Sequence, residues 1–425
     1  MNCLNFIFAA LAVLSFALAL WQWLAAKRFP LHKRIADFGF VPAISILKPL
    51  KGCDDTTFES LESWLKQKYS GQIQILFGVA DANDPVCKII EMLLQKYPEA
   101  DVKLIVCAEN LGANAKVATL AQLEKLAKHE LILASDADVR VPEDFLANVV
   151  APFSQELVAA DVSPLNLIGA DSHRLLQKEV GLVNCFYRLA NPATSAMQWE
   201  AIAVNADFWS QVLQSQMLKP MDFALGAVML TRRKILGEIG GFKSLVNCLA
   251  DDYQLGNRIA KKGYRIEICP VVVECWDSPM NWRDVWRHQL RWARTIRSCQ
   301  PLPYFFSILS NATFWSLVWL VWSLSRLTVK TRALDGGAGW VISTALPCGV
   351  TVAIFFCLAR IFIAYDLQKR FTANWKLVSP FWLVPVKDLF QAAIWFFAFA
   401  GNTVEWRGKK LKLRRDGTLV EQQSK

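Results

Sequence analysis

The sequence predicts an α/β domain with a mostly parallel sheet, flanked on both sides by membrane segments. Two observations carry this prediction. Between residues 43 and 135, four short apolar runs alternate with amphipathic helical patterns, as in sheets that carry helices on both faces. Long uncharged runs lie before and after the α/β region, and 54% of the 425 residues are hydrophobic, which is more than an ordinary soluble domain contains.

The first element is an uncharged run of 23 residues from Leu4 to Ala26. At 1.5 Å per residue, a helix of this length crosses a bilayer. A cleaved signal peptide is the weaker interpretation, because the run lacks a basic stretch before it and is longer than the usual apolar core of such peptides. We expect a permanent anchor over residues 1–26. The domain that follows is expected in the cytoplasm because basic residues come next: Lys27, Arg28, Lys33 and Arg34.

The α/β domain is expected over residues 27–297. Its strand-like runs lie at 43–47 (AISIL), 73–79 (IQILFGV), 102–107 (VKLIVC) and 130–135 (ELILAS). Between them, apolar residues recur at intervals of three and four in TFESLESWLKQ, PVCKIIEMLLQKY and KVATLAQLEKLAK, which is the pattern of amphipathic helices.

The motif LILASDADVRV, from Leu131 to Val141, ends the fourth predicted strand with two closely spaced carboxylates. In extended chain, Asp136 and Asp138 project to the same side, just beyond the carboxyl end of the strand. Open α/β sheets bind ligands at that edge. Two adjacent carboxylates suit Mg²⁺ or Mn²⁺, which prefer oxygen ligands. The competing interpretation is an Asp-rich turn.

Other polar residues follow the neighbouring strands at the same predicted edge. Pro49 lies in KPLKG after the first strand, Asp84 in ADANDP after the second, and Lys116 in ENLGANAK after the third. Lys116 stands where a helix begins, so its ammonium group and the backbone amides there are suited to bind a phosphate. A solvated loop lysine is the plain alternative, and only the convergence of these residues favours a site.

Two motifs further along the chain also carry polar side chains. LADDYQLGNRIAKKG places Asp251 and Asp252 at the start of an amphipathic helix, where one aspartate is explained as a cap and the second is left over. In WRHQLRWARTIR, helical spacing puts Arg287, Arg291 and Arg294 on one face, near Trp292. A basic helix lying on a membrane explains this second pattern equally well.

Apolar runs return after residue 297, and we expect a membrane region over 298–404. The runs at 298–325 and 336–359 are uncharged and long enough to span. Lys387 and Asp388 interrupt the last run, which we expect to be re-entrant, interfacial, or kinked around a buried ion pair. The tail over 405–425 is rich in basic residues, which favours the cytoplasm and two C-terminal spans rather than three.

The net charge of +10 gathers in this tail and beside the membrane segments, where it suits anionic lipid headgroups. We do not expect nucleic acid as a partner, because the sequence contains no recognisable nucleic-acid module in which a basic patch is interleaved with aromatics.

Five ordered motifs carry a family resemblance: ISILKPLKG, DANDP, SDADVRV, LADDY and HQLRW. Together they resemble the GT-A glycosyltransferases of families 2 and 21, the group of the ceramide glucosyltransferases and their hopanoid-directed bacterial relatives. The C-terminal GNTVEWRGKKLKL is also similar to that group. The resemblance runs from Ala43 to Gly417 and implies a Rossmann-like domain that binds a nucleotide sugar.

The resemblance implies a role for each matching residue. Asp84 corresponds to the aspartate near the nucleotide base, and Asp136 and Asp138 to the element that holds the divalent cation and UDP. Asp252 corresponds to the presumed general base. Arg291 and Trp292 match the end of the (Q/R)xxRW motif, but His288 stands where the family usually has Gln or Arg. Its role is therefore in doubt, although an imidazole still forms hydrogen bonds.

The implied function is transfer of a sugar, with glucose from UDP-glucose expected, to a lipid hydroxyl such as that of ceramide, with inversion to a β-glycoside. A hopanoid-directed UDP-GlcNAc transferase is the first alternative. A polysaccharide synthase is disfavoured because few C-terminal spans remain to form a channel, and a transporter because the apolar runs hold few paired charges. A calcium-dependent sugar-binding module is a further alternative, and it would not consume the UDP-sugar.

Overall fold

The computed structural model describes residues 3–35, 39–160, 179–334, 348–406, 409–414 and 417–421. The chain divides into two compact units, each built from separate stretches of sequence. The helical unit consists of Met1–Phe29, Pro192–Gln214 and Met280–Asn402, and the sheet unit of Pro30–Asn191, Ser215–Pro279 and Thr403–Lys425. This division differs from the continuous ranges 27–297 and 298–404 expected above, because parts of the first range belong to the helical unit.

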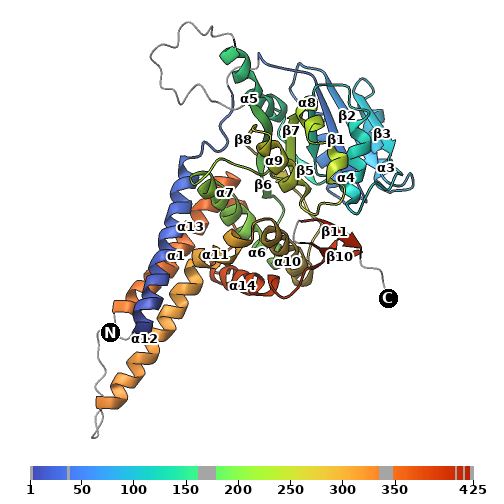
Figure 1. Ribbon diagram of the computed structural model, residues 1–425. Helices are drawn as coiled ribbons and strands as arrows, with labels where there is room; N and C mark the ends of the chain where they lie inside the picture. Colours follow the sequence, from blue (N-terminus) through green and yellow to red (C-terminus); the bar gives the residue numbers. More distant parts are fainter. Residues whose placement is uncertain are drawn as a thin grey trace. The chain divides into compact units, whose positions relative to one another are not determined.

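An eight-stranded sheet forms the centre of the sheet unit, in the order β3-β2-β1-β4-β7-β6-β8-β5 (Figure 1). Its strands are β1 (Ile44–Leu50), β2 (Ile73–Val79), β3 (Asp101–Val106), β4 (Leu131–Ser135), β5 (Val139–Arg140), β6 (Val180–Leu189), β7 (Val228–Arg232) and β8 (Arg265–Cys275). The four strands predicted from the sequence are confirmed, and β1 continues three residues beyond its predicted end, through Leu50.

The sheet is parallel in its first half and mixed in its second. Strand β1 pairs in parallel with β2 and β4, and β2 with β3. Strand β7 then runs antiparallel to both β4 and β6, while β6 pairs in parallel with β8. The α/β class is confirmed, but the expectation of a mostly parallel sheet holds only for β1 to β4. The carboxyl ends of β1, β2 and β4 share one edge of the sheet.

Among the described residues, the helices that accompany these strands are α2 (Thr57–Glu62), α3 (Val86–Lys96), α4 (Ala115–Glu124), α5 (Phe145–Ala160), α8 (Arg233–Glu238), the 3-10 helix η4 (Phe242–Leu245) and α9 (Asp251–Lys261). Helix α4 packs against β1 and β2, and α5 packs against β6 and β8. The strands are fully buried at Ile46, Phe77 and Leu133. Burial of each such side chain contributes about 1.5–3 kcal/mol, which holds the sheet edge in place.

A second, three-stranded antiparallel sheet completes the sheet unit, in the order β11-β10-β9. Its strands are β9 (Thr403–Trp406), β10 (Lys409–Leu413) and β11 (Leu419–Glu421). The sequence predicted a basic tail here and no strands. Val404, Leu411 and Leu419 are buried in a cluster with Leu249, so the apolar residues between the lysines attach these strands to the segment that precedes α9.

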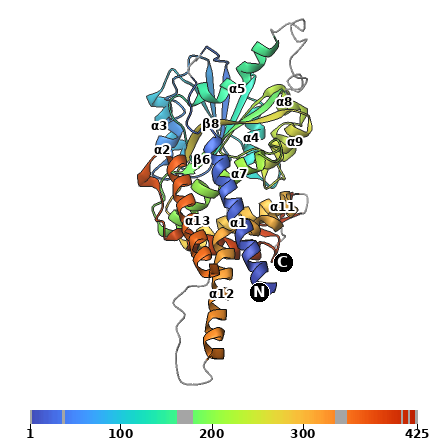
Figure 2. The same ribbon diagram turned by 90° about the vertical axis from the view of Figure 1, so that its left-hand side faces the viewer.

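The helical unit contains α1 (Cys3–Arg28), α6 (Ser195–Ile202), a π-helical turn η3 (Ala203–Phe208), all but the last two residues of α7 (Trp209–Gln216), α10 (Trp282–Cys299), α11 (Pro301–Phe306), η5 (Ser307–Ser310), α12 (Ala312–Leu334), α13 (Cys348–Thr372), η6 (Trp375–Leu377) and α14 (Leu383–Ala398). Helices α1, α12 and α13 lie side by side in both views (Figures 1 and 2). Small residues permit this close approach, since Ala12 and Ala353 are fully buried beside Trp319 and Phe356.

Two of these helices, α1 and α13, are long and apolar enough to cross a membrane. The first confirms the membrane-length segment predicted over residues 4–26. The run predicted at 298–325 is instead broken into Pro301–Ser310 and Ala312–Ser325, which meet at a bend of 51° and supply a third span only if they count as one. The first part of the run predicted at 336–359 lies outside the described residues, and α13 continues past that run to Thr372.

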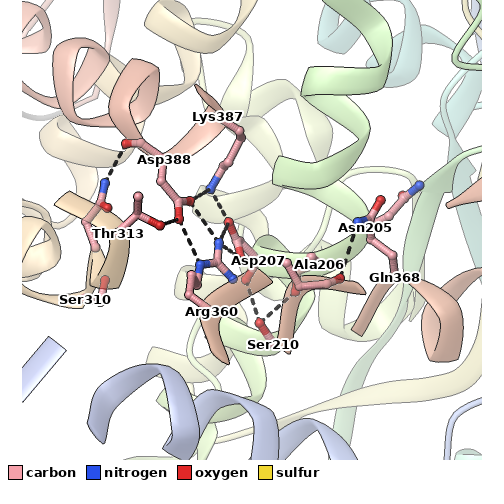
Figure 3. Close-up of polar contacts among 12 residues, drawn as sticks. Asn205, Ala206, Asp207, Ser210, Ser310, Thr313, Arg360, Gln368, Lys387 and Asp388 are labelled. Atoms are coloured by element: carbon pink, nitrogen blue, oxygen red, sulfur yellow. Dashed lines mark hydrogen bonds and ion pairs between the residues drawn. The ribbon is translucent and has the colours of Figure 1, made fainter. Parts of the chain in front are cut away.

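Lys387 and Asp388, which interrupt the last apolar run, lie in α14, a helix of 16 residues. This is shorter than the roughly 20 residues that a span needs. Both residues belong to a buried ion cluster with Asp207 of η3 and Arg360 of α13, and Figure 3 shows the two carboxylates pointing toward the two cations. The buried ion pair considered from the sequence is therefore present, with two further members.

Each charged group of the ion cluster has an oppositely charged neighbour. Arg360 Nη2 donates to Asp207 Oδ1 at 2.9 Å, and Arg360 Nε donates to Asp388 Oδ2 at 2.9 Å. Lys387 Nζ pairs with Asp207 and lies 3.4 Å from Asp388 Oδ1. Thr313 Oγ1 donates to Asp388 Oδ2 at 2.5 Å. The cluster connects η3, α13, α14 and the start of α12.

Candidate active site

Asp136 and Asp138 form the connection between β4 and β5, at the edge where β1 and β4 end. The backbone N–H of Asp136 donates to Ala227 O at 3.2 Å, and Trp276 N–H donates to Asp138 O at 3.2 Å. Burial raises the pKa of Asp138 to about 7, and the nearby charges of Asp136 and Asp277 add to the shift. The predicted pair of carboxylates is thus held together where charge is costly.

Lys48 is a functional candidate that the sequence analysis missed. It lies within β1 with no exposed surface, and its Nζ donates to Asp136 O at 2.6 Å and to Ser135 Oγ at 3.2 Å. Burial lowers the pKa of Lys48 to about 7, although Asp138 and Asp136 oppose the shift. The sequence feature that could have identified Lys48 is its charge within the otherwise apolar run ISILKPL. Pro49 follows it in β1, where it pairs with Gly78.

Lys116 lies at the start of α4 and pairs with carboxylates from two other segments. Its Nζ is 2.6 Å from Asp136 Oδ1 and 3.3 Å from Asp251 Oδ2. Burial alone would lower the pKa of Lys116, but these two carboxylates raise it above its ordinary value. The side chain expected to meet a phosphate therefore lies beside Asp136, as a fixed cation.

Asn114 connects the start of α4 to the start of α9. Its side chain accepts from Val117 N–H at 3.2 Å, which caps α4. Its Nδ2 donates to Cys248 O at 2.8 Å and lies 3.4 Å from Asp251 Oδ1. Asp251 therefore faces α4. The sequence predicted an aspartate as the cap of α9, but the N-cap residue is Ala250, whose side chain forms no capping hydrogen bond.

Asp252, the next residue of α9, is the predicted general base. Its Oδ1 accepts from Tyr253 N–H at 2.7 Å. Burial raises the pKa of Asp252 to about 6, with a further contribution from Asp251 and opposition from Lys116. A Cβ atom at Gly226 would lie 2.9 Å from Asp252 Oδ2, so only glycine leaves this carboxylate its present position.

Asp84 is held in place by backbone hydrogen bonds from two segments of the chain. Both of its carboxylate oxygens accept from Gly52 N–H, at 2.9 and 3.0 Å, and Oδ1 also accepts from Val86 N–H at 3.0 Å. Gly52 has a φ of 69°, which favours glycine. Asp84 thus fixes the loop after β1 to the loop after β2; its expected contact with a nucleotide base stays a prediction.

The acidic cluster, defined as Asp136, Asp138, Asp251 and Asp252 with Lys48 and Lys116, has two more carboxylates than cations. Oxygen donors with excess negative charge suit Mg²⁺ or Mn²⁺. Among the residues that the structure describes, no three acidic, histidine or cysteine side chains are arranged to hold a metal ion. Such ions often take one or two protein carboxylates and complete their shell with phosphate oxygens. The donor set therefore fits a cation that arrives with a diphosphate.

The predicted residues His288, Arg291 and Trp292 lie on α10, which belongs to the helical unit. This helix begins with a capping box formed by Asn281 and Asp284. His288 and Trp292 contact each other edge to face, with ring centroids 4.5 Å apart. The expected placement of these residues on one helix is confirmed, and His288 has a buried acidic neighbour, Glu200, that the sequence analysis did not consider.

Comparison with known protein families gives one match that covers nearly all of the chain. The sequence matches the profile of glycosyl transferase family 21 over residues 5–169 and 170–419. All candidate site residues fall within these two stretches.

Individual relatives are more distant. Ceramide glucosyltransferase 3 of Caenorhabditis elegans is 24% identical over 58% of this chain and 48% of its own length. A ceramide glucosyltransferase of Candida albicans is 32% identical over 27% of this chain and 23% of its length. The probable glycosyltransferase YdaM of Bacillus subtilis is 23% identical over 60% and 55%. The chain spans about half the length of the Caenorhabditis proteins it matches.

Among solved structures, the mannosyltransferase PcManGT of Pyrobaculum calidifontis, in complex with GDP-Man and Mn²⁺, aligns with 91% of this chain and 99% of its own, at 19% identity and a TM-score of 0.47. Staphylococcus aureus TarS 1-349 with UDP-GlcNAc aligns with 89% and 99%, at 10% identity and a TM-score of 0.37.

Proposed function

Because the chain belongs to glycosyl transferase family 21, we propose that it transfers a sugar from a UDP-sugar, expected to be UDP-glucose, to the hydroxyl group of a membrane lipid such as ceramide. The observation that carries this proposal is the acidic cluster at the edge of the sheet. Its excess of two carboxylates is suited to a divalent cation and a nucleotide diphosphate together. Membership of family 21 supports the class of reaction, and the excess of carboxylates supports the proposed site for the cation and the diphosphate.

Asp252 is the proposed general base. The attacking hydroxyl must lose a proton, and a carboxylate with a pKa of about 6 is deprotonated at neutral pH while it remains a stronger base than an ordinary aspartate. Lys116 stands 2.6 Å from Asp136 and holds that carboxylate in place. A single displacement at the anomeric carbon inverts it, so an α-linked donor gives a β-glycoside.

Asp136 and Asp138 are the residues proposed to hold the cation. A cation held there would supply positive charge to the departing diphosphate. Arg291 is proposed to contribute positive charge to the same leaving group, and Trp292 to line the site. Asp84 and Pro49 are proposed to border the nucleotide.

A lipid acceptor is supported by the apolar helices of the same chain. Helices α1 and α13 have the length and composition of membrane spans, so a lipid hydroxyl at headgroup level needs no transfer through water. The last turn of α1 carries two basic residues, Lys27 and Arg28, which favours the cytoplasm for the sheet unit. Labelling of a cysteine engineered after residue 405 tests this: an impermeant reagent outside intact cells should not react with it, and reaction would contradict the assignment.

The test of the function is transfer by membranes that contain the protein. Supplied with UDP-glucose or UDP-GlcNAc and a lipid extract, they should form a glycolipid, identified by mass spectrometry, and excess EDTA should stop its formation. Membranes with Asp252→Asn are the matched control. No new glycolipid with either donor would contradict the proposal, and the donor that is used identifies the sugar.

A further inference from the structure

Helices α6 and α7 of the helical unit are joined by the π-helical turn η3 into one segment that contacts several neighbouring helices. Trp209 of α7 stacks on Phe371 of α13, with ring centroids 4.9 Å apart. Trp199 of α6 meets Phe390 of α14 at 5.2 Å. Inserted π turns occur frequently at functional sites. The side chains on this segment are therefore candidates for a role beyond packing.

Glu200 is the acidic residue of α6, and it is 1% exposed. Its Oε1 accepts two hydrogen bonds, from Gln289 Nε2 at 2.8 Å and from the ring Nδ1 of His288 at 2.8 Å. Its Oε2 has no hydrogen-bond partner among the described residues. A buried carboxylate is costly unless it is paired, so this position is not explained by packing alone.

The contact with Glu200 determines which nitrogen of His288 is available. A carboxylate accepts hydrogen bonds, so Nδ1 carries the proton, and Nε2 is the acceptor nitrogen of the neutral ring. The side chain of His288 retains 26% of its exposure, against 1% for Glu200. The ring is thus held by a buried carboxylate while part of its own surface stays exposed.

The π turn brings a second contact to the same helix. In an unbroken α-helix, Glu200 and Phe208 would point roughly 80° apart, because they are eight residues apart at 3.6 residues per turn. Here both face α10: Glu200 contacts His288, and Phe208 lies 6.5 Å from Trp292 between ring centroids. Asp207, beside Phe208, is fixed by the ion cluster. One segment therefore holds both His288 and Trp292.

We propose that Glu200 is a positioning residue that fixes the imidazole of His288 so that Nε2 accepts a hydrogen bond from a hydroxyl or amide N–H of the lipid headgroup, apart from the hydroxyl that is glycosylated. The lipid is assigned because α10 belongs to the helical unit, as do α1 and α13, the two described helices that are long and apolar enough to cross a membrane. This inference rests on the proposed transfer to a lipid.

Steady-state kinetics with both substrates varied test the proposal. Glu200→Ala and His288→Ala should each raise KM for the lipid about tenfold, the effect of one hydrogen bond, and leave KM for the UDP-sugar unchanged. Glu200→Gln, which keeps an acceptor oxygen, should restore the lipid KM to within about twofold. The double variant Glu200→Ala/His288→Ala should have the same lipid KM as His288→Ala alone.

Gln289→Ala is the matched control, because it removes the other donor to the same oxygen; its lipid KM should not change. The proposal would be overturned if Gln289→Ala raised the lipid KM as much as Glu200→Ala does, or if the increases in lipid KM were additive in the double variant. A raised KM for the UDP-sugar in Glu200→Ala or His288→Ala would also overturn it. Absence of transfer by the wild type would instead contradict the proposed function.

A measurement on the wild type avoids any question of variant folding. The chain has four histidines, so the ¹⁵N spectrum of histidine-labelled protein is simple, and His288→Gln identifies the signal. At a pH where the ring is neutral, Nδ1 should carry the proton. A neutral ring protonated at Nε2 would overturn the proposal.

Discussion

The acidic cluster of the sheet unit and the ion cluster of the helical unit are built from similar groups but balanced differently. In the ion cluster, two carboxylates face two cations, and the four side chains are between 4% and 8% exposed. In the acidic cluster, four carboxylates accompany two lysines, and Asp136 keeps 35% of its side-chain exposure. The charges of the ion cluster balance within the protein, whereas the acidic cluster has more carboxylates than cations and a partly exposed carboxylate, Asp136.

We interpret this difference as that between a structural role and the binding role proposed for the acidic cluster. A complete buried ion cluster adds little stability over apolar residues of the same size, but it makes the loss of any one member costly. In the acidic cluster, burial and then the neighbouring carboxylates raise the pKa of Asp138 to about 7 and that of Asp252 to about 6. The ionised form of such a carboxylate is stabilised when a positively charged ligand binds beside it.

The largest effect is expected in the acidic cluster. Asp252→Asn keeps the shape of the side chain but cannot accept a proton, so the transfer rate should fall about 10²–10⁴-fold. Affinity for the UDP-sugar, measured by calorimetry, should stay within about twofold. The matched control is Asp251→Asn, which is expected to retain more activity. If Asp251→Asn is inactive and Asp252→Asn is not, the two roles are assigned the wrong way round.

In the ion cluster, loss of one member should affect folding rather than chemistry. Asp388→Ala leaves Arg360 and Lys387 with one carboxylate between them and should lower the free energy of unfolding by about 3–5 kcal/mol. The double variant Arg360→Met/Asp388→Leu leaves one balanced pair, Lys387 with Asp207, and should lose much less. Denaturant unfolding in detergent measures both. A double variant as unstable as the single one would show that charge balance is not the cause.

Gly226→Ala should act on the acidic cluster without unfolding the protein. The added Cβ would lie 2.9 Å from Asp252 Oδ2, at the flexible end of a side chain, so the carboxylate moves and the backbone does not. Displacement of a catalytic group by about 1 Å costs on the order of 10²-fold in rate. The expected result is a lower transfer rate with an unchanged melting temperature. An unchanged rate would place the proton acceptor elsewhere.

The pH dependence of transfer is the mildest of these effects. The pKa of Asp252 lies at about 6, above its ordinary value of 3.8, and only the deprotonated base accepts a proton. The rate should therefore rise about tenfold per pH unit below 6 and level off above it. A stopped assay from pH 5 to 8 measures this, with Asp252→Glu expected to shift the inflection. A rate that falls with rising pH would exclude Asp252 as the base.

Local patterns made much of the sheet unit predictable. Strands β1 to β4, the carboxylates of Asp136 and Asp138, and the place of Lys116 at a helix start all follow from runs of a few residues. Strand β7 was missed because its antiparallel pairing joins segments far apart in the chain. Lys48 was missed because a lysine inside an apolar strand acquires a role only once Asp136 lies against it.

Long-range contacts account for what was missed in the helical unit. Lys387 and Asp388 were recognised as a possible buried pair, but Asp207 lies 153 residues from Arg360, its partner. Glu200 is 88 residues from His288. No periodicity connects such positions, so only the folded chain identifies these carboxylates as partners of a cation and of an imidazole.

The most direct test of the central claim is the binding of Mn²⁺ in the presence of UDP, followed by electron paramagnetic resonance. The wild type should bind one Mn²⁺ per chain. Asp138→Ala should weaken this binding at least about tenfold, because it removes one of two carboxylate ligands, whereas Arg360→Met/Asp388→Leu should bind as the wild type does. No bound Mn²⁺ in the wild type, or equal affinity in Asp138→Ala, would contradict the conclusion that the unbalanced charge marks a cation and nucleotide site.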